Sequence, residues 1–167
     1  GRVALSEEGA VATQITVEEG QTFTLTTTGV ELTEGKHYWE VELVSESNLD
    51  LIYIGITRPN LNPTGDYWDD NCTDGWFMCS GDGSLSGNGK EFSDEAGAYT
   101  KGERVGVLLD LDDGSLRFFK NGVQHGPGYA AGSVTGPVVA AVQMLITGTA
   151  VRLLPNVKHL SANVVSI

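Results

Sequence analysis

The sequence predicts an all-β protein built from two stacked antiparallel sheets, and three observations carry this prediction. Helical periodicity is missing, because Gly, Pro or paired β-branched residues interrupt every candidate window before three turns accumulate. Short apolar runs recur along the chain, separated by turn residues that include many of its 22 glycines. Two hairpin signals, Asp113-Gly114 and Asn121-Gly122, bracket one short aromatic strand.

The two hairpin signals predict a tight antiparallel meander. Asp-Gly and Asn-Gly favour two-residue type I′ turns, in which both central residues take positive φ. The flanking runs, Val105 to Leu111 and Leu116 to Phe119, have the apolar character of strands.

Further strands are expected wherever apolar residues alternate or cluster between turn residues. The expected strands are Ala12 to Val17, Thr22 to Thr27, Lys36 to Val44, Leu51 to Thr57, Gly75 to Cys79, Arg104 to Asp110, Leu116 to Lys120, Val138 to Leu145 and Ala150 to Leu154, with weaker short ones near Val3, Leu85 and Val123.

A period of two along these strands predicts which side chains form the core. In the Lys36 strand, Tyr38, Glu40 and Glu42 fall on the face opposite the apolar one, which predicts a solvated outer surface. Gly55, inside an otherwise apolar strand, predicts a close approach by a neighbour such as an aromatic ring. The predicted buried set is Trp39, Val41, Leu43, Ile52, Ile54, Ile56, Val105, Val107 and Leu109.

Length and charge limit the possible functions. A chain of 167 residues suits one well-buried domain. Its formal net charge of -12 repels phosphate backbones and anionic lipids, so nucleic acid and membranes are not expected partners. The acidic residues are dispersed, which favours a solvated, soluble surface. With no long apolar run, and with Cys72 and Cys79 at a spacing typical of neither zinc nor redox sites, we expect an intracellular, cytoplasmic protein.

The segment from Arg58 to Asp74 is a long polar loop, beyond the usual limit of about 12 to 15 residues for a loop without structure of its own. Loops of that length are usually functional or disordered. Tyr67 and Trp68 argue against disorder, because adjacent large aromatics in a polar loop either pin it to the core or present a contact surface.

Four ordered motifs resemble the SPRY (B30.2) family: Gly35 to Leu43 (GKHYWEVEL), Gly102 to Asp110, Asp110 to Val123 and Gly136 to Val142. The resemblance implies a bent, concanavalin A-like β-sandwich that acts as a protein-interaction module without catalytic activity. It places the SPRY core at residues 35–155, N-terminal strands at 1–34 as a PRY-like extension packed on the same sandwich, and a C-terminal segment at 156–167.

The resemblance also implies a shallow surface of end loops that binds a protein or short peptide, as the partner- or substrate-selecting module of a larger protein. Peptide-binding relatives often carry Val-Trp-Gly where this chain has Gln143-Met144-Leu145. We expect Thr57, Arg58, Tyr67 and Met144 to converge on one rim of the sandwich. The implied contact residues are Thr26, Thr27, Thr28, Thr57, Arg58, Tyr67, Trp68, Gln143, Met144 and Leu145.

The alternative interpretation is a lectin-like or glucanase-type sandwich that binds or degrades carbohydrate. Glu40 and Glu42 share one strand face as glucanase carboxylates do, but position 45 is serine where a third acid is needed. The aspartates of the Arg58 loop lack the order of a calcium loop. His37, His125 and His159 show no triad spacing. We therefore expect no catalytic residue, no metal site and no cofactor.

Overall fold

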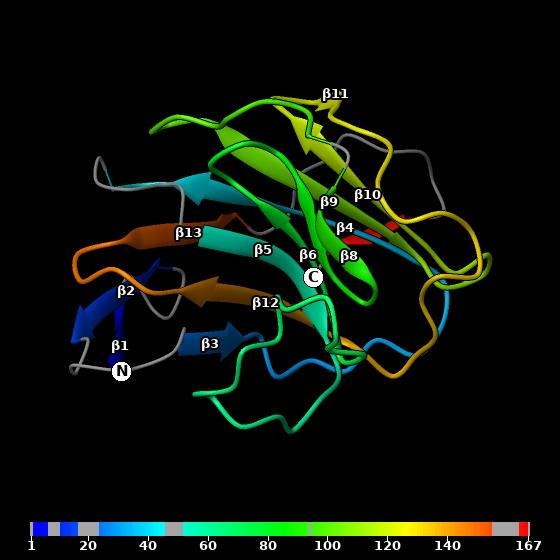
Figure 1. Ribbon diagram of the computed structural model, residues 1–167, viewed down its shortest axis with the longest axis horizontal. Coiled ribbons are helices and arrows are strands. Elements are labelled where there is room, and N and C mark those ends of the chain that lie inside the picture. Colours follow the sequence, from blue (N-terminus) through cyan, green and yellow to red (C-terminus); the bar gives the residue numbers. More distant parts are fainter. Residues whose placement is uncertain are drawn as a thin grey trace.

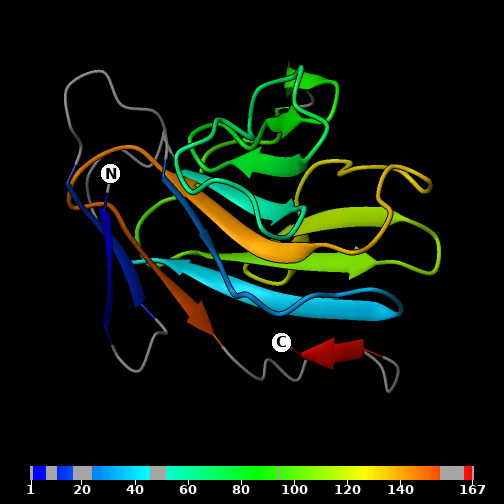
Figure 2. The ribbon, with the colours of Figure 1, turned by 90° about the horizontal axis from the view of Figure 1, so that it is seen from below.

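The computed structural model describes residues 2–6, 11–16, 24–45, 52–93, 95–154 and 164–166, which contain strands and no helix. The strands form an eight-stranded and a six-stranded sheet, stacked as two layers (Figures 1 and 2). No helix long and apolar enough to cross a membrane occurs in these ranges. The predicted all-β sandwich is confirmed.

The eight-stranded sheet runs in the order β1 (Arg2–Ser6), β2 (Val11–Thr16), β13 (Ala150–Leu154), β4 (Lys36–Leu43), β9 (Arg104–Asp110), β10 (Ser115–Lys120) and β11 (Val123–Gln124), with β14 (Val164–Ser166) beside β4. The six-stranded sheet runs β3 (Thr24–Thr27), β12 (Val139–Met144), β5 (Ile52–Thr57), β6 (Gly75–Cys79), β7 (Leu85–Gly87) and β8 (Lys90–Ser93). The pairings are antiparallel except that of β14 with β4.

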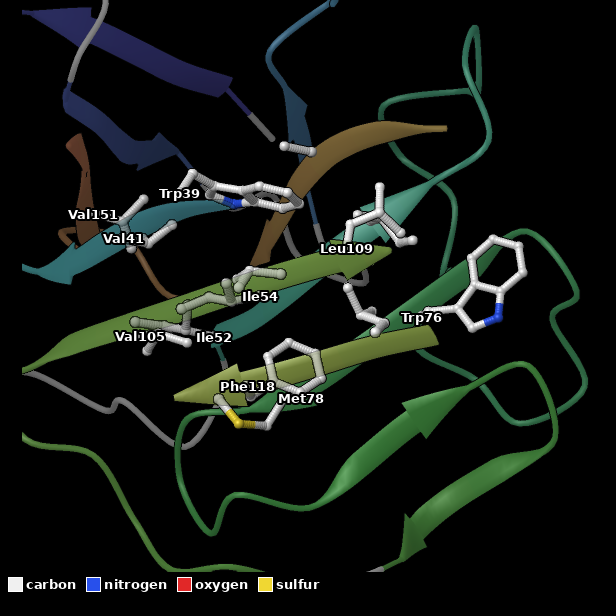
Figure 3. Packing of buried hydrophobic residues seen from close by; sticks show 14 of the residues in the cluster. Trp39, Val41, Ile52, Ile54, Trp76, Met78, Val105, Leu109, Phe118 and Val151 are labelled. Atoms are coloured by element: carbon white, nitrogen blue, oxygen red, sulfur yellow. The ribbon is translucent and has the colours of Figure 1, made fainter. Parts of the chain in front are cut away.

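The main core lies between the two sheets, where period-two side chains of both inner faces meet. Figure 3 shows Trp39, Val41 and Val151 near one end of this core and Trp76 at the other. Every member of the predicted buried set is at most 3% exposed, so the predicted register of these strands is confirmed.

The two hairpin signals gave different turns. Lys120 pairs with Val123, and both residues between them have positive φ, 49° at Asn121 and 84° at Gly122, as a type I′ turn requires. Asp110 instead pairs with Ser115 across four residues, and of these only Gly114 has positive φ. The two-residue prediction at Asp113-Gly114 was wrong, because the Asp110 carboxylate accepts the N–H groups of Asp112 and Asp113 and holds a wider turn.

Two strands were missed. β8 follows Asn88-Gly89, whose φ values of 48° and 77° make another tight turn, so this dipeptide was a hairpin signal that could have been recognised. β14 pairs with the first residues of β4 in parallel, and a three-residue strand has no periodicity of its own to announce it. The N-terminal strands divide between the layers, with β1 and β2 in one sheet and β3 in the other.

Gly55 faces the backbone of β6 rather than an aromatic ring. A Cβ at this position would overlap the carbonyl oxygen of Trp76. The expected close approach is present, but it comes from the backbone of the neighbouring strand β6, which pairs with β5 at this position.

Candidate functional site

The long loop from Arg58 to Asp74 folds back against the outer face of the six-stranded sheet. The Arg58 N–H donates to the carbonyl of Asp74 at 2.8 Å and closes the loop at its base. The Leu25 N–H donates to the carbonyl of Pro63 at 2.7 Å, which fastens the loop to the free edge of β3. The loop is therefore an ordered layer on the sandwich.

Apolar side chains of the loop complete a second, smaller core on this outer face. The Trp68 ring stacks on Tyr53, with centroids 5.3 Å apart and planes 21° from parallel. Tyr67 and Trp68 both pack on the sheet and both remain half-buried, so each pins the loop and each is still partly exposed to solvent. The sheet residues of this cluster are Leu25, Tyr53, Phe77, Cys79 and Ala141, and the half-buried residues over them are Leu61, Tyr67, Trp68 and Leu145.

Gln143 of β12 holds the loop through its side-chain amide. The Tyr67 N–H donates to Gln143 Oε1 at 3.1 Å, and Gln143 Nε2 donates to the carbonyl of Gly65 at 2.8 Å. The loop lies close enough to β6 that a Cβ on Gly75 would overlap the Tyr67 carbonyl oxygen. Burial, together with the nearby Asp74 carboxylate, raises the pKa of Tyr67, which therefore stays neutral.

The Arg58 guanidinium binds other residues of the same chain, whereas the sequence suggested that it faces a ligand. Its Nη1 donates to the carbonyls of Thr135 and Pro137, and its Nη2 donates to Thr135 Oγ1 at 3.0 Å. The guanidinium carbon lies 5.0 Å from the centre of the Trp76 ring, a cation–π distance. Arg58 thus clamps the segment before β12 to the start of the loop.

Three further candidates present no side chain to a partner. Thr57, Gln143 and Met144 have exposures of 0%, and Met144 belongs to the main core. The expected convergence on one rim was also wrong. Because β5 and β12 are antiparallel, Thr57 lies opposite Val139 and Met144 opposite Ile52, so Thr57 and Met144 stand at opposite ends of the sheet.

Thr26, Thr27 and Thr28 line an apolar groove of about 380 Å³ at the open side of the sandwich. Leu5 and Val30, exposed by 62% and 53%, stand at this groove, and Trp39 and Val41 of the core also line it. By the period of two along β3, Thr27 shares the outer face with Leu25, whereas Thr26 turns inward. Of the three threonines, Thr27 therefore extends the surface formed by Tyr67, Trp68 and Leu145.

The outer face of the eight-stranded sheet carries the two glutamates of β4. Tyr38 and Glu40 are each only 4% exposed, so the predicted solvated face was wrong at these two positions. Glu40 accepts a hydrogen bond from the Tyr38 hydroxyl at 2.9 Å and lies 3.5 Å from Arg104 Nη1, while Glu42 pairs with Arg152 at 2.7 Å. Burial and the Glu40 carboxylate raise the pKa of Tyr38. Both carboxylates are taken up in ion pairs.

The aspartates of the loop do not gather around a common centre. Asp69 Oδ1 accepts the Asn71 N–H at 2.8 Å and the Asn71 side-chain amide at 2.9 Å, which organises a local turn. Within the described ranges, no group of three or more His, Cys, Asp or Glu side chains is placed to hold a metal ion.

The structure is a β-sandwich with a loop pinned on the outer face of one sheet, and comparison with known proteins identifies its family. The SPRY domain family matches residues 36–155, and the chain belongs to that family. SPRY domains are generally protein-interaction modules.

Solved SPRY domains share the fold. The SPRY domain of human HERC1 is 17% identical with a TM-score of 0.73, over 90% of this chain and 91% of that one. The PSpry domain of TRIM65 is 19% identical with a TM-score of 0.70, over 92% and 86%. A further human SPRY domain is 18% identical with a TM-score of 0.71, over 90% and 93%. At these identities the likeness concerns the fold.

Proposed function

We propose that this domain binds a protein or short peptide, without catalysis, through a surface that we call the loop face: Thr27, Leu61, Tyr67, Trp68 and Leu145. In a larger protein it selects the partner or substrate. The observation that carries this proposal is the pair of half-buried rings, Tyr67 and Trp68, held on a rigid sheet by Gln143 and Tyr53.

Pre-organised aromatics favour this role on physical grounds. Binding costs conformational entropy when loops must be ordered, and a loop already fixed on the sheet avoids most of that cost. Tyr and Trp dominate the energetics of protein interfaces because they bury large areas with few rotatable bonds. The free thiols of Cys72 and Cys79 fit action inside the cell, in a reducing compartment.

The test is affinity capture of partners from a cell extract by the parent and by the Tyr67→Ala and Trp68→Ala variants. Val123→Ala is the matched control, because Val123 is a large side chain 72% exposed on the other sheet. Thermal melting must first show that each variant is folded at the assay temperature. We expect the two loop variants to lose about 2 kcal/mol of binding, or roughly 30-fold, and the control to bind normally. Retention of every partner by both loop variants would overturn the proposal.

A further inference from the structure

Charge is divided unevenly between the two faces of the sandwich. From residue 59 to residue 89 the sequence contains five aspartates and no Lys or Arg, and the next cation along the chain is Lys90, at the start of β8. The single cation at the start of the loop, Arg58, is occupied by Thr135, Pro137 and Trp76. On the eight-stranded sheet, in contrast, several acidic side chains pair with cations. Its ion pairs are Lys36–Asp110, Arg104–Glu40, Lys120–Glu103 and Arg152–Glu42.

Three of these five aspartate carboxylates interact electrostatically with the aromatic residues or with the neighbouring thiol. Asp74 acts on Tyr67, and Asp74 and Asp69 act on the neighbouring Cys72 thiol, whose pKa is raised by burial and by these charges. On the far side of the ring stack, Asp82 acts on Tyr53, the partner of Trp68. The Asn71 N–H holds the pKa of Asp69 below its usual range, so this carboxylate stays charged. Among the described residues, Asp69, Asp70 and Asp74 form no ion pair with a Lys or Arg.

The apolar loop face and the carboxylates near it together limit which kind of partner segment can bind there. An acidic segment would meet like charges, and a purely apolar segment would bury the carboxylates without compensation. A cation meets both requirements, because it is attracted to the π-faces of Trp and Tyr rings and also to carboxylates. Arginine is favoured over lysine, since its planar guanidinium stacks on a ring while its N–H groups reach carboxylate oxygens.

We propose that the loop face recognises a positively charged, arginine-bearing extended segment of the partner protein. One guanidinium stacks on the accessible part of Tyr67 or Trp68 and pairs with Asp69 or Asp74. This inference rests on the proposed function and adds the chemistry of the partner to it.

The first test uses three fluorescent peptides of equal length, acetylated and amidated, with Gly alternating with Arg, Lys or Glu. Binding to the parent domain is followed by fluorescence anisotropy. We expect the Arg peptide to bind more tightly than the Lys peptide and the Glu peptide not to bind. Raising NaCl from about 20 mM to about 500 mM should weaken the Arg complex by roughly tenfold or more, since salt screens the carboxylates. Equal binding of the Arg and Glu peptides would overturn the inference.

The second test separates a local site from net charge. The variant Asp69→Asn, Asp70→Asn, Asp74→Asn removes three charges from the loop and keeps the oxygens that accept hydrogen bonds. The control variant Glu31→Gln, Glu34→Gln, Glu95→Gln removes three charges from exposed positions outside it. We expect about tenfold weaker binding of the Arg peptide by the first variant and less than twofold change in the second. Equal weakening in both would show attraction to net charge alone and would reject the site.

The two proposals fail differently. If Trp68→Ala loses captured partners while the parent does not bind the Arg peptide, the loop face is the binding surface but the partner's segment is not cationic. The opposite outcome is that the Arg peptide binds the parent and not the aspartate variant, whereas captured partners still bind Tyr67→Ala and Trp68→Ala. In that case the loop binds a cation, but the natural partner binds at another surface.

Discussion

Arg58 shows how far a single residue can be interpreted from sequence. Its position after a buried strand was predicted correctly, but its partners, Thr135 and Pro137, lie more than 70 residues away along the chain. No local pattern encodes such a contact. The same holds for Glu40, which alternation placed on the outer face and which Tyr38 and Arg104 then cover. The sequence predicted where along a strand, or on which face of it, each of these side chains lies, but not which residues it contacts.

The first prediction concerns the clamp formed by Arg58. Arg58→Ala should lower the free energy of unfolding by about 1 to 2 kcal/mol, because it removes hydrogen bonds to Thr135 and Pro137 and the cation–π contact with Trp76. Chemical denaturation measures this. Arg58→Lys should recover little, since an ammonium cannot reproduce the fork. Arg117→Ala, on the outer face of β10, serves as the control and should change stability by about 0.5 kcal/mol or less. Equal losses in the Arg58 and Arg117 variants would contradict the clamp.

At the scale of elements, alternation and turn residues located most strands within one or two residues, because one buried face imposes a period of two that is visible locally. What alternation could not predict was the order of strands in the sheets. β5 and β12 are neighbours although more than 80 residues separate their starts, and their antiparallel register is what separates Thr57 from Met144. The expected convergence on one rim was wrong because it depended on this pairing, whereas partner binding by Tyr67 and Trp68 stays a prediction.

The second prediction compares two glycines in strand interiors. In Gly55→Ala the new methyl meets the Trp76 carbonyl, which is backbone and cannot move without distorting β5 and β6. In Gly106→Ala it meets the Tyr38 hydroxyl and Phe119 Cβ, which are side-chain atoms. We expect Gly55→Ala to cost about 3 kcal/mol or more and Gly106→Ala about 1 to 2 kcal/mol. Thermal melting of both variants checks the order, and a less stable Gly106→Ala variant would reverse the assignment.

For the whole molecule, the fold class followed from composition, turns and the family motifs, whereas the division of charge between the two faces did not. The acidic residues looked dispersed along the sequence. Folding pairs part of them with cations on the eight-stranded sheet, whereas Asp69, Asp70 and Asp74 have no Lys or Arg partner among the described residues. Ion pairs on a sheet form between residues of neighbouring strands, so they can be identified only when the order of the strands is known.

The third prediction concerns acid stability. Burial alone would raise the pKa of Asp110, but hydrogen bonds from Lys36 and from the N–H groups of Asp112 and Asp113 outweigh it and hold the pKa below its usual range. A lowered folded-state pKa stabilises the protein above the ordinary carboxyl pKa, near 4, and this contribution disappears as the pH falls through the folded-state value. Asp110→Asn should thus be less stable than the parent at neutral pH.

The stability difference between parent and Asp110→Asn should narrow as the pH falls below about 4, where the parent loses the same charge. Urea denaturation at several pH values measures it. A difference that stays constant over this range would mean that Asp110 acts through shape alone.

The fourth prediction concerns metal. Chelation of divalent cations with EDTA should leave the melting temperature unchanged, because Asp69 is occupied by Asn71 and no metal-binding group occurs among the described residues. A ligand of the native state raises its stability by mass action, so a melting temperature that falls with EDTA and recovers with calcium would favour the lectin-like alternative.

The amide of Gln143 has a consequence for how this domain could diversify. Its hydrogen bonds to the loop go to main-chain atoms, the N–H of Tyr67 and the carbonyl of Gly65. These bonds therefore do not depend on which side chains the loop carries. Attachment and display are therefore separable, as they are in antibody hypervariable loops. The side chain at an exposed loop position such as residue 66 could be exchanged while Gly65, Gly75, Gln143 and the turn of Asp69 and Asn71 stay fixed, which would turn one scaffold into a set of domains with different partners.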